Sequence, residues 1–233
     1  MAALANVQEL DLAESTLREV NVALKRHRDG EEAAFRVLHP KGAHALACGL
    51  DGPVQVEIAG HVGYYCAGMN QQASVVVEGN VGPGVAENMM SGLVHVKGDA
   101  SQAAGATAHG GLLVVDGNAS ARCGISLKGA DIVVKGNVGH MSAFMAQAGR
   151  LVVCGDAGDA LGDSLYETRI YVRGRVKSLG ADCIEKEMRA EHLAELEALL
   201  ERAGCSGVEA GDFRRYGSAR KLYNFHADHL DAY

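Results

Sequence analysis

Four carboxylates lie close together in the sequence and are the first candidates for acid–base chemistry: Asp156, Asp159, Asp163 and Glu167. A polysaccharide-cleaving enzyme needs paired acids, or acids beside a basic residue, that face one another across the scissile bond. These four residues follow one another along one short stretch, and the pattern does not stack them on neighbouring layers of a fold. We therefore interpret them as solvated loop carboxylates.

The histidines and cysteines show no spacing that is typical of a metal site. The six cysteines include no C-x-x-C pair, so neither a zinc site nor an iron–sulfur site is indicated, and we expect reduced, mostly buried thiols. Four histidines in the middle of the chain fall at four different positions of the repeat described below: His61, His95, His109 and His140. We expect surface or core roles for them, and no metal-binding residue is predicted.

The run from Gly79 to Gly84, GNVGPG, resembles a phosphate-binding loop. Such a loop binds phosphate where its backbone N–H groups lead into the start of a helix. No helical pattern follows this run, so we reject a dinucleotide site. The sequence offers no catalytic, cofactor-binding or metal-binding residue, and the isolated chain is not expected to be an enzyme.

Glycine recurs every nineteen residues through the middle of the chain. The seven members, here called the anchor glycines, are Gly60, Gly79, Gly98, Gly117, Gly136, Gly155 and Gly174. A fixed period without insertions is the signature of a repeat architecture. Asn or Asp follows five of the seven, which indicates tight corners where the side chain bonds its own nearby backbone. Only Ala or Gly occurs seven residues after each anchor, which indicates a narrow corner.

Apolar residues stand four and two residues before each anchor glycine and two residues after it. These even offsets place all three columns on one face of an extended chain. One such strand cannot bury its apolar face alone, so successive turns must stack in register. The pattern predicts a mainly β fold, a parallel β-helix of about seven turns spaced by ~4.8 Å.

The flanking segments are expected to cover the two open ends of this coil. Residues 1–40 should contain an amphipathic helix from Ser15 to Lys25, with Ser15 as its N-cap, and a lead-in strand at 34–38. The β-helix then spans 41–183, and a second helix spans 184–204. The arm at 205–233 is rich in aromatic residues, unlike a disordered tail, so we expect it to dock on a surface.

Composition argues against several functions. A net charge of −7 disfavours nucleic-acid binding, which needs clustered Lys and Arg. The first thirty residues are too acidic for a targeting peptide, and no apolar run reaches membrane-spanning length. We therefore expect a cytoplasmic protein without a membrane segment.

An apolar stripe is predicted on the outside of the coil, three residues before the anchor. Such a stripe must be covered by the chain's own helices or by another subunit, and the sequence leaves both open. The candidate interface residues are Val76, Val114, Val133, Val152 and Tyr171 on this stripe, with Phe213, Tyr216, Tyr223 and Phe225 on the arm.

The glycine turns, together with the flanks STLREVNVALK at 15–25 and YGSARKLYNF at 216–225, resemble the GXGXG domain of the glutamate synthase family. In that family the domain is a right-handed β-helix at the C-terminal end of the large subunit. The present chain looks like the separate GXGXG subunit of N-methylglutamate synthase and related three-subunit assemblies.

The resemblance implies partners and cofactors. One partner would be an amidotransferase-like subunit with an N-terminal cysteine nucleophile, and another an FMN-binding synthase subunit with an iron–sulfur cluster. The resulting hetero-oligomer would form N-methylglutamate from methylamine and glutamate. No catalytic, FMN or cluster residue of the family falls in this domain, so the chain is expected to be a rigid spacer.

Two alternatives stay open. The β-helical subunit of a formylmethanofuran dehydrogenase or formyltransferase/hydrolase complex would share the coil. A free-standing carbohydrate-active β-helix enzyme belongs to a different class. The neighbouring genes would discriminate among the three.

Overall fold

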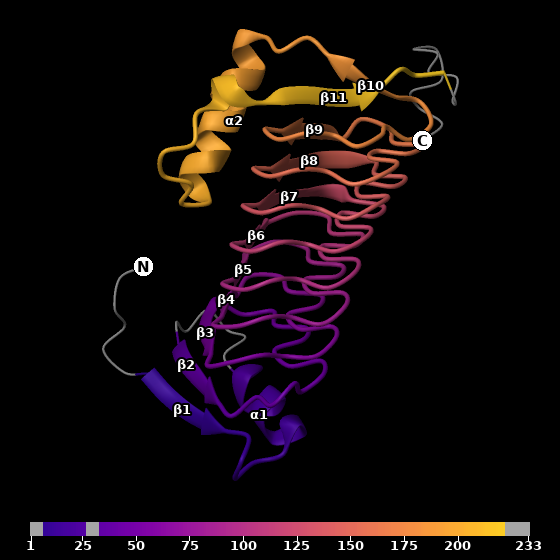
Figure 1. Ribbon diagram of the computed structural model, residues 1–233. Coiled ribbons are helices and arrows are strands. Elements are labelled where there is room, and N and C mark those ends of the chain that lie inside the picture. Colours follow the sequence, from indigo (N-terminus) through magenta and orange to yellow (C-terminus); the bar gives the residue numbers. More distant parts are fainter. Residues whose placement is uncertain (1–6, 27–32, 222–233) are drawn as a thin grey trace, which may run out of the picture.

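The computed structural model describes residues 7–26 and 33–221, and it shows a parallel β-helix closed at both ends by the chain itself (Figure 1). One sheet runs the length of the molecule in the order β1-β2-β3-β4-β5-β6-β7-β8-β9-β11-β10. The strands from β1 to β9 pair in parallel with their neighbours. The predicted mainly β fold is confirmed.

Seven of these strands stand at the same place in successive turns. They are β3 (Val54–Ile58), β4 (Ser74–Val77), β5 (Leu93–Val96), β6 (Leu112–Val115), β7 (Lys128–Val134), β8 (Ala148–Val153) and β9 (Arg169–Val172). Equivalent residues pair across neighbouring turns, as Val77 does with Val96 and Val96 with Val115. The register is therefore the nineteen-residue period of the sequence.

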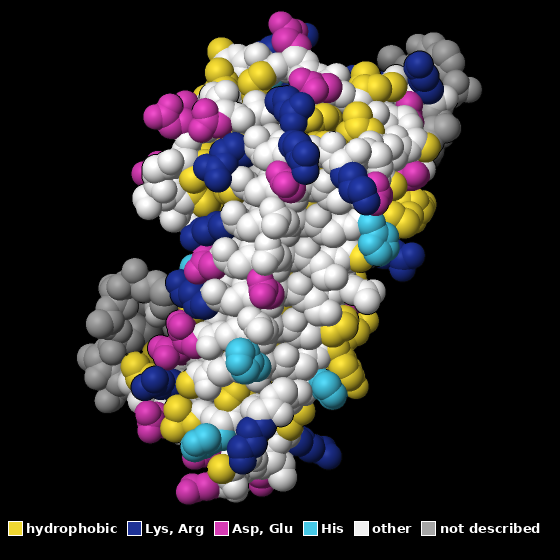
Figure 2. Space-filling view, viewed as in Figure 1, with side chains coloured by type: hydrophobic (Ala, Val, Ile, Leu, Met, Phe, Trp, Pro, Cys, Tyr) yellow, Lys and Arg dark blue, Asp and Glu magenta, His cyan; other side chains and the backbone are white. Residues whose placement is uncertain are grey.

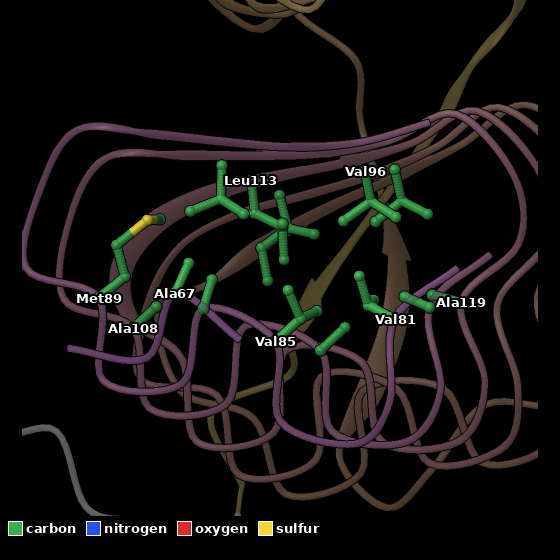
Figure 3. Close-up of a cluster of buried hydrophobic side chains, with 14 of the residues drawn as sticks. Ala67, Val81, Val85, Met89, Val96, Ala108, Leu113 and Ala119 are labelled. Atoms are coloured by element: carbon green, nitrogen blue, oxygen red, sulfur yellow. The ribbon is translucent and has the colours of Figure 1, made fainter. Parts of the chain in front are cut away.

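The core lies inside the coil, between the strands and the opposite wall. Val96 and Leu113 on the strands point toward Val81 and Val85 on the facing wall (Figure 3), and none of the four side chains is more than 4% exposed. The column two residues after the anchor glycines forms its own run of isolated parallel bridges, from Val62 to Val176. The three predicted apolar columns thus make the two walls of one core.

The anchor glycines are required by close approach between turns. Backbone N–H groups link six of them, from Gly79 to Gly174, into one column, with Gly98 N donating to Gly79 O at 3.1 Å and Gly117 N to Gly98 O at 3.1 Å. A methyl group built on Gly117 would lie 2.3 Å from Asp99 Oδ1 and 2.8 Å from Gly98 O. Five of the seven, from Gly98 to Gly174, would meet the side chain of an Asn or Asp of the turn below.

These Asn and Asp side chains bond to the next turn rather than to their own. Asn80 Oδ1 accepts from Asp99 N at 2.9 Å, Asp99 Oδ1 from Asn118 N at 2.7 Å, and Asn118 Oδ1 from Asn137 N at 2.9 Å. The expectation that they bond their own backbone was wrong. The side chains form a ladder along the coil, and glycine leaves the space through which each one reaches upward.

A second corner uses left-handed backbone at small residues. Seven residues after the anchor glycine, Ala67 and Ala86 have φ of 52° and 55°, and Gly105 has φ of 67°. A methyl group on Gly105 would lie 2.5 Å from Ile132 Cδ1 in the core. The narrow corner predicted from this column is present, and its residues are small because the backbone there lies against the core.

The N-terminal segment covers the first end of the coil. It consists of β1 (Val7–Asp11), α1 (Leu17–Leu24) and β2 (Ala33–Leu38). Thr16 rather than Ser15 is the N-cap, because Thr16 and Glu19 form a reciprocal capping box. Val20 and Leu24 are buried in the coil's core. Strand β1 was not predicted, because it has no alternating apolar pattern; it forms by pairing with β2.

The C-terminal segment closes the other end. It consists of β10 (Cys183–Lys186), α2 (Ala190–Arg202), the short 3₁₀ helix η1 (Ala210–Asp212) and β11 (Arg214–Ser218). The predicted helix start at Ile184 was wrong, because Ile184 pairs with Gly217 in the sheet. Strand β11 lies antiparallel between β9 and β10, so this part of the arm docks on the chain's own last turn.

Candidate interaction surfaces

The outer apolar stripe is covered by the chain's own helix over its upper part. Val114, Val133, Val152 and Tyr171 are at most 2% exposed, and they share one cluster with the buried face of α2. The cluster includes Leu196, Leu199 and Leu200 of α2 and Ala203, the residue that follows the helix. Figure 1 shows α2 beside β7, β8 and β9. These four stripe residues therefore are not available to another subunit, which corrects their candidacy as interface residues.

Ion pairs fix α2 over the stripe. The carboxylate of Asp131 is buried and accepts from Arg150 Nε at 2.6 Å and Nη2 at 2.8 Å, and from Arg202 Nη1 at 3.2 Å. Glu195 on α2 accepts from Arg169 Nη1 at 2.5 Å and from Tyr171 Oη at 2.7 Å. Burial and this hydrogen bond raise the pKa of Tyr171. Polar contacts in the middle of the helix and at its C-terminal end thus set its position.

The structure treats the remaining interface candidates in three ways: two are buried, two lie outside the described residues, and one is half-buried. Phe213 and Tyr216 are 4% and 2% exposed within the chain, so they too are removed from the candidate interface. Tyr223 and Phe225 lie outside the described residues. Val76, at the lower end of the stripe, is half-buried and belongs to neither core cluster, and its role in an interface stays a prediction.

The four candidate acids each have a separate structural partner. Asp156 Oδ1 accepts from Arg175 N at 2.7 Å as the upper member of the Asn and Asp ladder. Asp159 pairs with Lys177 Nζ at 2.7 Å, and Glu167 with Arg220 Nη2 at 2.8 Å. Asp163 accepts from Ser164 Oγ and from Ala181 N. Each carboxylate thus has a partner in the coil or its C-terminal cover.

The middle histidines also lie apart. His61 Nδ1 accepts from Asn80 N at 2.8 Å, His95 Nε2 lies 2.9 Å from Asp116 Oδ1, and His109 and His140 are exposed. Within residues 7–26 and 33–221, no group of three His, Cys, Asp or Glu side chains could hold a metal ion. Over the same residues, no helix is both long and apolar enough for a membrane span.

Exposed apolar side chains lie on the loop side of the coil, and the sequence analysis missed them. They are between 41% and 50% exposed and are here called the ridge: Tyr64, Tyr65, Met69 and Met90 on the first two turns, and Met145 three turns further along. Tyr64 stacks on His44 with ring centroids 3.9 Å apart, and Tyr65 Oη donates to Glu87 Oε1 at 2.9 Å. Figure 2 shows hydrophobic side chains on the side of the coil away from its strands.

The ridge has a sequence signal that could have located it. Met69 and Met145 both stand nine residues after an anchor glycine, where Asn88, Thr107, Ser126 and Ser164 occupy other turns. Large apolar residues in an otherwise polar column indicate a surface that binds another protein. Tyr and Met are also enriched in protein interfaces. The ridge therefore replaces the stripe as the candidate interaction surface.

These features define a capped parallel β-helix whose conspicuous outer feature is an apolar ridge. No family model matches the chain. Protein GlxC from Rhizobium meliloti (strain 1021) is 64% identical over 225 residues, which are 96% of this chain and 99% of that protein. The chain belongs to the family of Protein GlxC.

Proposed function

We propose that this chain is a non-catalytic structural subunit of a glutamate synthase-like complex, and most closely of an N-methylglutamate synthase. In that complex it bridges an amidotransferase-like subunit and an FMN-binding synthase subunit. The assembly converts methylamine and glutamate to N-methylglutamate and ammonia. The proposal combines the GXGXG resemblance with the β-helix and the ridge.

The observation that carries the proposal is a rigid coil with an uncovered ridge. Backbone hydrogen bonds and the Asn and Asp ladder link each turn to the next, and the chain's own elements close both ends. Seven turns at ~4.8 Å give a body of roughly 34 Å along its axis. Such a body suits a spacer between two active centres, because it resists bending while its surface offers docking sites.

In this proposal the cofactors belong to a partner. FMN and the iron–sulfur cluster sit in the synthase subunit and supply its redox chemistry. The candidate acids of this chain are engaged in structural pairs, as described above, and their positions suit a supporting role. In the assembly, the chain sets the distance between the two partner subunits and their relative orientation.

The test of the proposal is activity with and without partners. The chain, the amidotransferase-like subunit and the FMN-binding synthase subunit are purified separately and mixed, and formation of N-methylglutamate from methylamine and glutamate is measured. We expect no turnover by the chain alone and the highest rate with all three. Turnover by the isolated chain, or full turnover by the two partners without it, would refute the proposal.

A matched pair of variants tests the ridge. Met69→Glu places a charge on the ridge, and Gln8→Glu places the same charge at an exposed position on strand β1, at the end of the sheet. We expect Met69→Glu to weaken capture of a partner by at least tenfold, since a desolvated charge in an interface is costly. Equal capture by the two variants would place the interface elsewhere.

A further inference from the structure

Two cysteines meet where the C-terminal end of α2 lies on the coil. Cys154 directly follows β8, and Cys205 follows α2 by three residues. Both residues line one cavity of about 270 Å³. Cys154 is 3% exposed and Cys205 is half-buried at the surface, so one thiol lies beneath the other.

The cavity is also lined by two cations. Lys135 Nζ donates to the carbonyl oxygen of Gly204 at 3.4 Å, next to Cys205, and it pairs with Asp116 Oδ1 at 2.8 Å. Arg173 Nε donates to the carbonyl oxygen of Cys154 at 2.9 Å. A small anionic molecule that enters the cavity would therefore meet positive charge and a thiol together.

The environment shifts the pKa values of the two thiols in opposite directions. The neighbouring Cys154 thiol, aided by Lys135 and Arg173, lowers the pKa of Cys205 below its ordinary value. The Cys205 thiol, together with burial, raises the pKa of Cys154. Of the two thiols, Cys205 is the one whose ionisation is favoured and Cys154 the one that keeps its proton, the arrangement of a nucleophilic and a resolving cysteine.

The other four cysteines lack this combination. Cys66 and Cys123 are fully buried, and burial raises the pKa of each thiol to about 12. Burial likewise raises the pKa of Cys183 to about 12 and that of Cys48 above its ordinary value. Cys205 is thus the cysteine that ionises most readily. Since the thiolate is the reactive form of cysteine, Cys205 is expected to be the most reactive of the six.

We propose that Cys205 and Cys154 form a redox-active dithiol site that reacts with small anionic disulfides of the glutathione type. The Cys205 thiolate attacks one sulfur of the disulfide, forms a mixed disulfide and releases one glutathione thiolate. Cys154 then loses its proton to solvent and attacks Cys205 Sγ, which releases the second glutathione thiolate. The protein is oxidised by two electrons, and one glutathione disulfide is reduced to two glutathione molecules.

The reaction has a structural consequence. The new bond joins the last turns of the coil to the end of α2, the helix that covers the outer apolar stripe. It closes a loop of about fifty residues and so restricts the unfolded chain. The redox state of the site would therefore set how firmly α2 is held on the coil.

The test uses the full-length chain and glutathione disulfide. The reduced chain is incubated with glutathione disulfide near neutral pH, and its peptides are mapped by mass spectrometry without reduction. We expect a Cys154–Cys205 cross-linked peptide, and a Tm roughly 5–10 °C higher than that of the reduced chain. In Cys154→Ser we expect a stable glutathione adduct on Cys205 instead, because the resolving thiol is missing.

Two controls keep the proposal falsifiable. Cys183→Ser should form the cross-link as wild type does, and iodoacetamide should label Cys205 at least about tenfold faster than Cys48 at pH 7. The proposal is overturned if the wild-type chain yields no Cys154–Cys205 peptide. It is also overturned if the Cys154→Ser chain carries its adduct on another cysteine, or if Cys48 is labelled as fast as Cys205.

Discussion

Asp116 contacts three basic side chains from the two neighbouring turns of the coil wall. Its carboxylate lies 2.8 Å from Lys135 Nζ, 2.9 Å from His95 Nε2 and 3.7 Å from Lys97 Nζ. The lysines stand one turn above and one turn below, as the alternating charges before the anchor glycines predict. His95 lies on a strand one turn below and completes the cluster. Its contact with Asp116 could not be predicted, because it depends on side-chain direction.

The Asp116 cluster gives a pH-dependent contribution to stability. Burial raises the pKa of Asp116, but hydrogen bonds from Lys135 and His95 outweigh it and leave the pKa below its ordinary value. A carboxylate whose pKa is lower in the folded state than in the unfolded state stabilises the fold at pH values above its unfolded-state pKa. This stabilisation is lost as the pH falls through the folded-state pKa. Asp116→Asn should cost about 1 kcal/mol at pH 7.

The measurement is urea denaturation of wild type and Asp116→Asn at several pH values. The difference between the two should be constant from neutral pH down to about pH 5 and should shrink below it. A difference that stays constant down to the acid limit would show that the ionised carboxylate contributes nothing.

Gly117 tests the close approach between turns. Gly117→Ala would press a methyl group against Asp99 Oδ1, which accepts from Asn118 N at 2.7 Å. We expect a loss of about 1–3 kcal/mol, since one rung of the ladder must break. Gly211→Ala is the matched control, because its methyl group would meet no heavy atom within 4 Å. Equal free energies of unfolding for the two variants would contradict the packing argument.

At the scale of elements, α2 and β10 show why a helix and a neighbouring strand differ in how well the sequence predicts them. The buried residues of α2 are His192, Leu196, Leu199 and Leu200, which have the helical spacing that a local pattern can predict. The start of α2 was not predicted, because β10 forms only by pairing with β11, some thirty residues later. The helix pattern is local in sequence, whereas the strand depends on a partner that local pattern does not reveal.

The role of α2 as a cover can be measured directly. Leu196 is fully buried in the cluster over the stripe, and Glu197 beside it is exposed. Leu196→Ala should cost about 2–5 kcal/mol in the free energy of unfolding, and Glu197→Ala should change it by less than about 0.5 kcal/mol. If Leu196→Ala were as mild as Glu197→Ala, α2 would not be packed on the coil as described.

At the scale of the whole molecule, the nineteen-residue period made the fold predictable and left the surface open. Register follows from the period, and so do the three buried columns, because each repeats seven times. Coverage of the stripe could not be predicted, since it depends on where α2 returns in space. The ridge could not be found from apolar columns alone, because Tyr64 and Met90 stand in columns of mixed type.

The central claim is that this chain joins two different subunits. The direct measurement is the mass of the species that copurifies with the tagged chain when both proposed partners are expressed with it. The account predicts one assembly that contains all three subunits. If the tagged chain emerges alone, or with only one partner bound at saturation, the bridging function is contradicted.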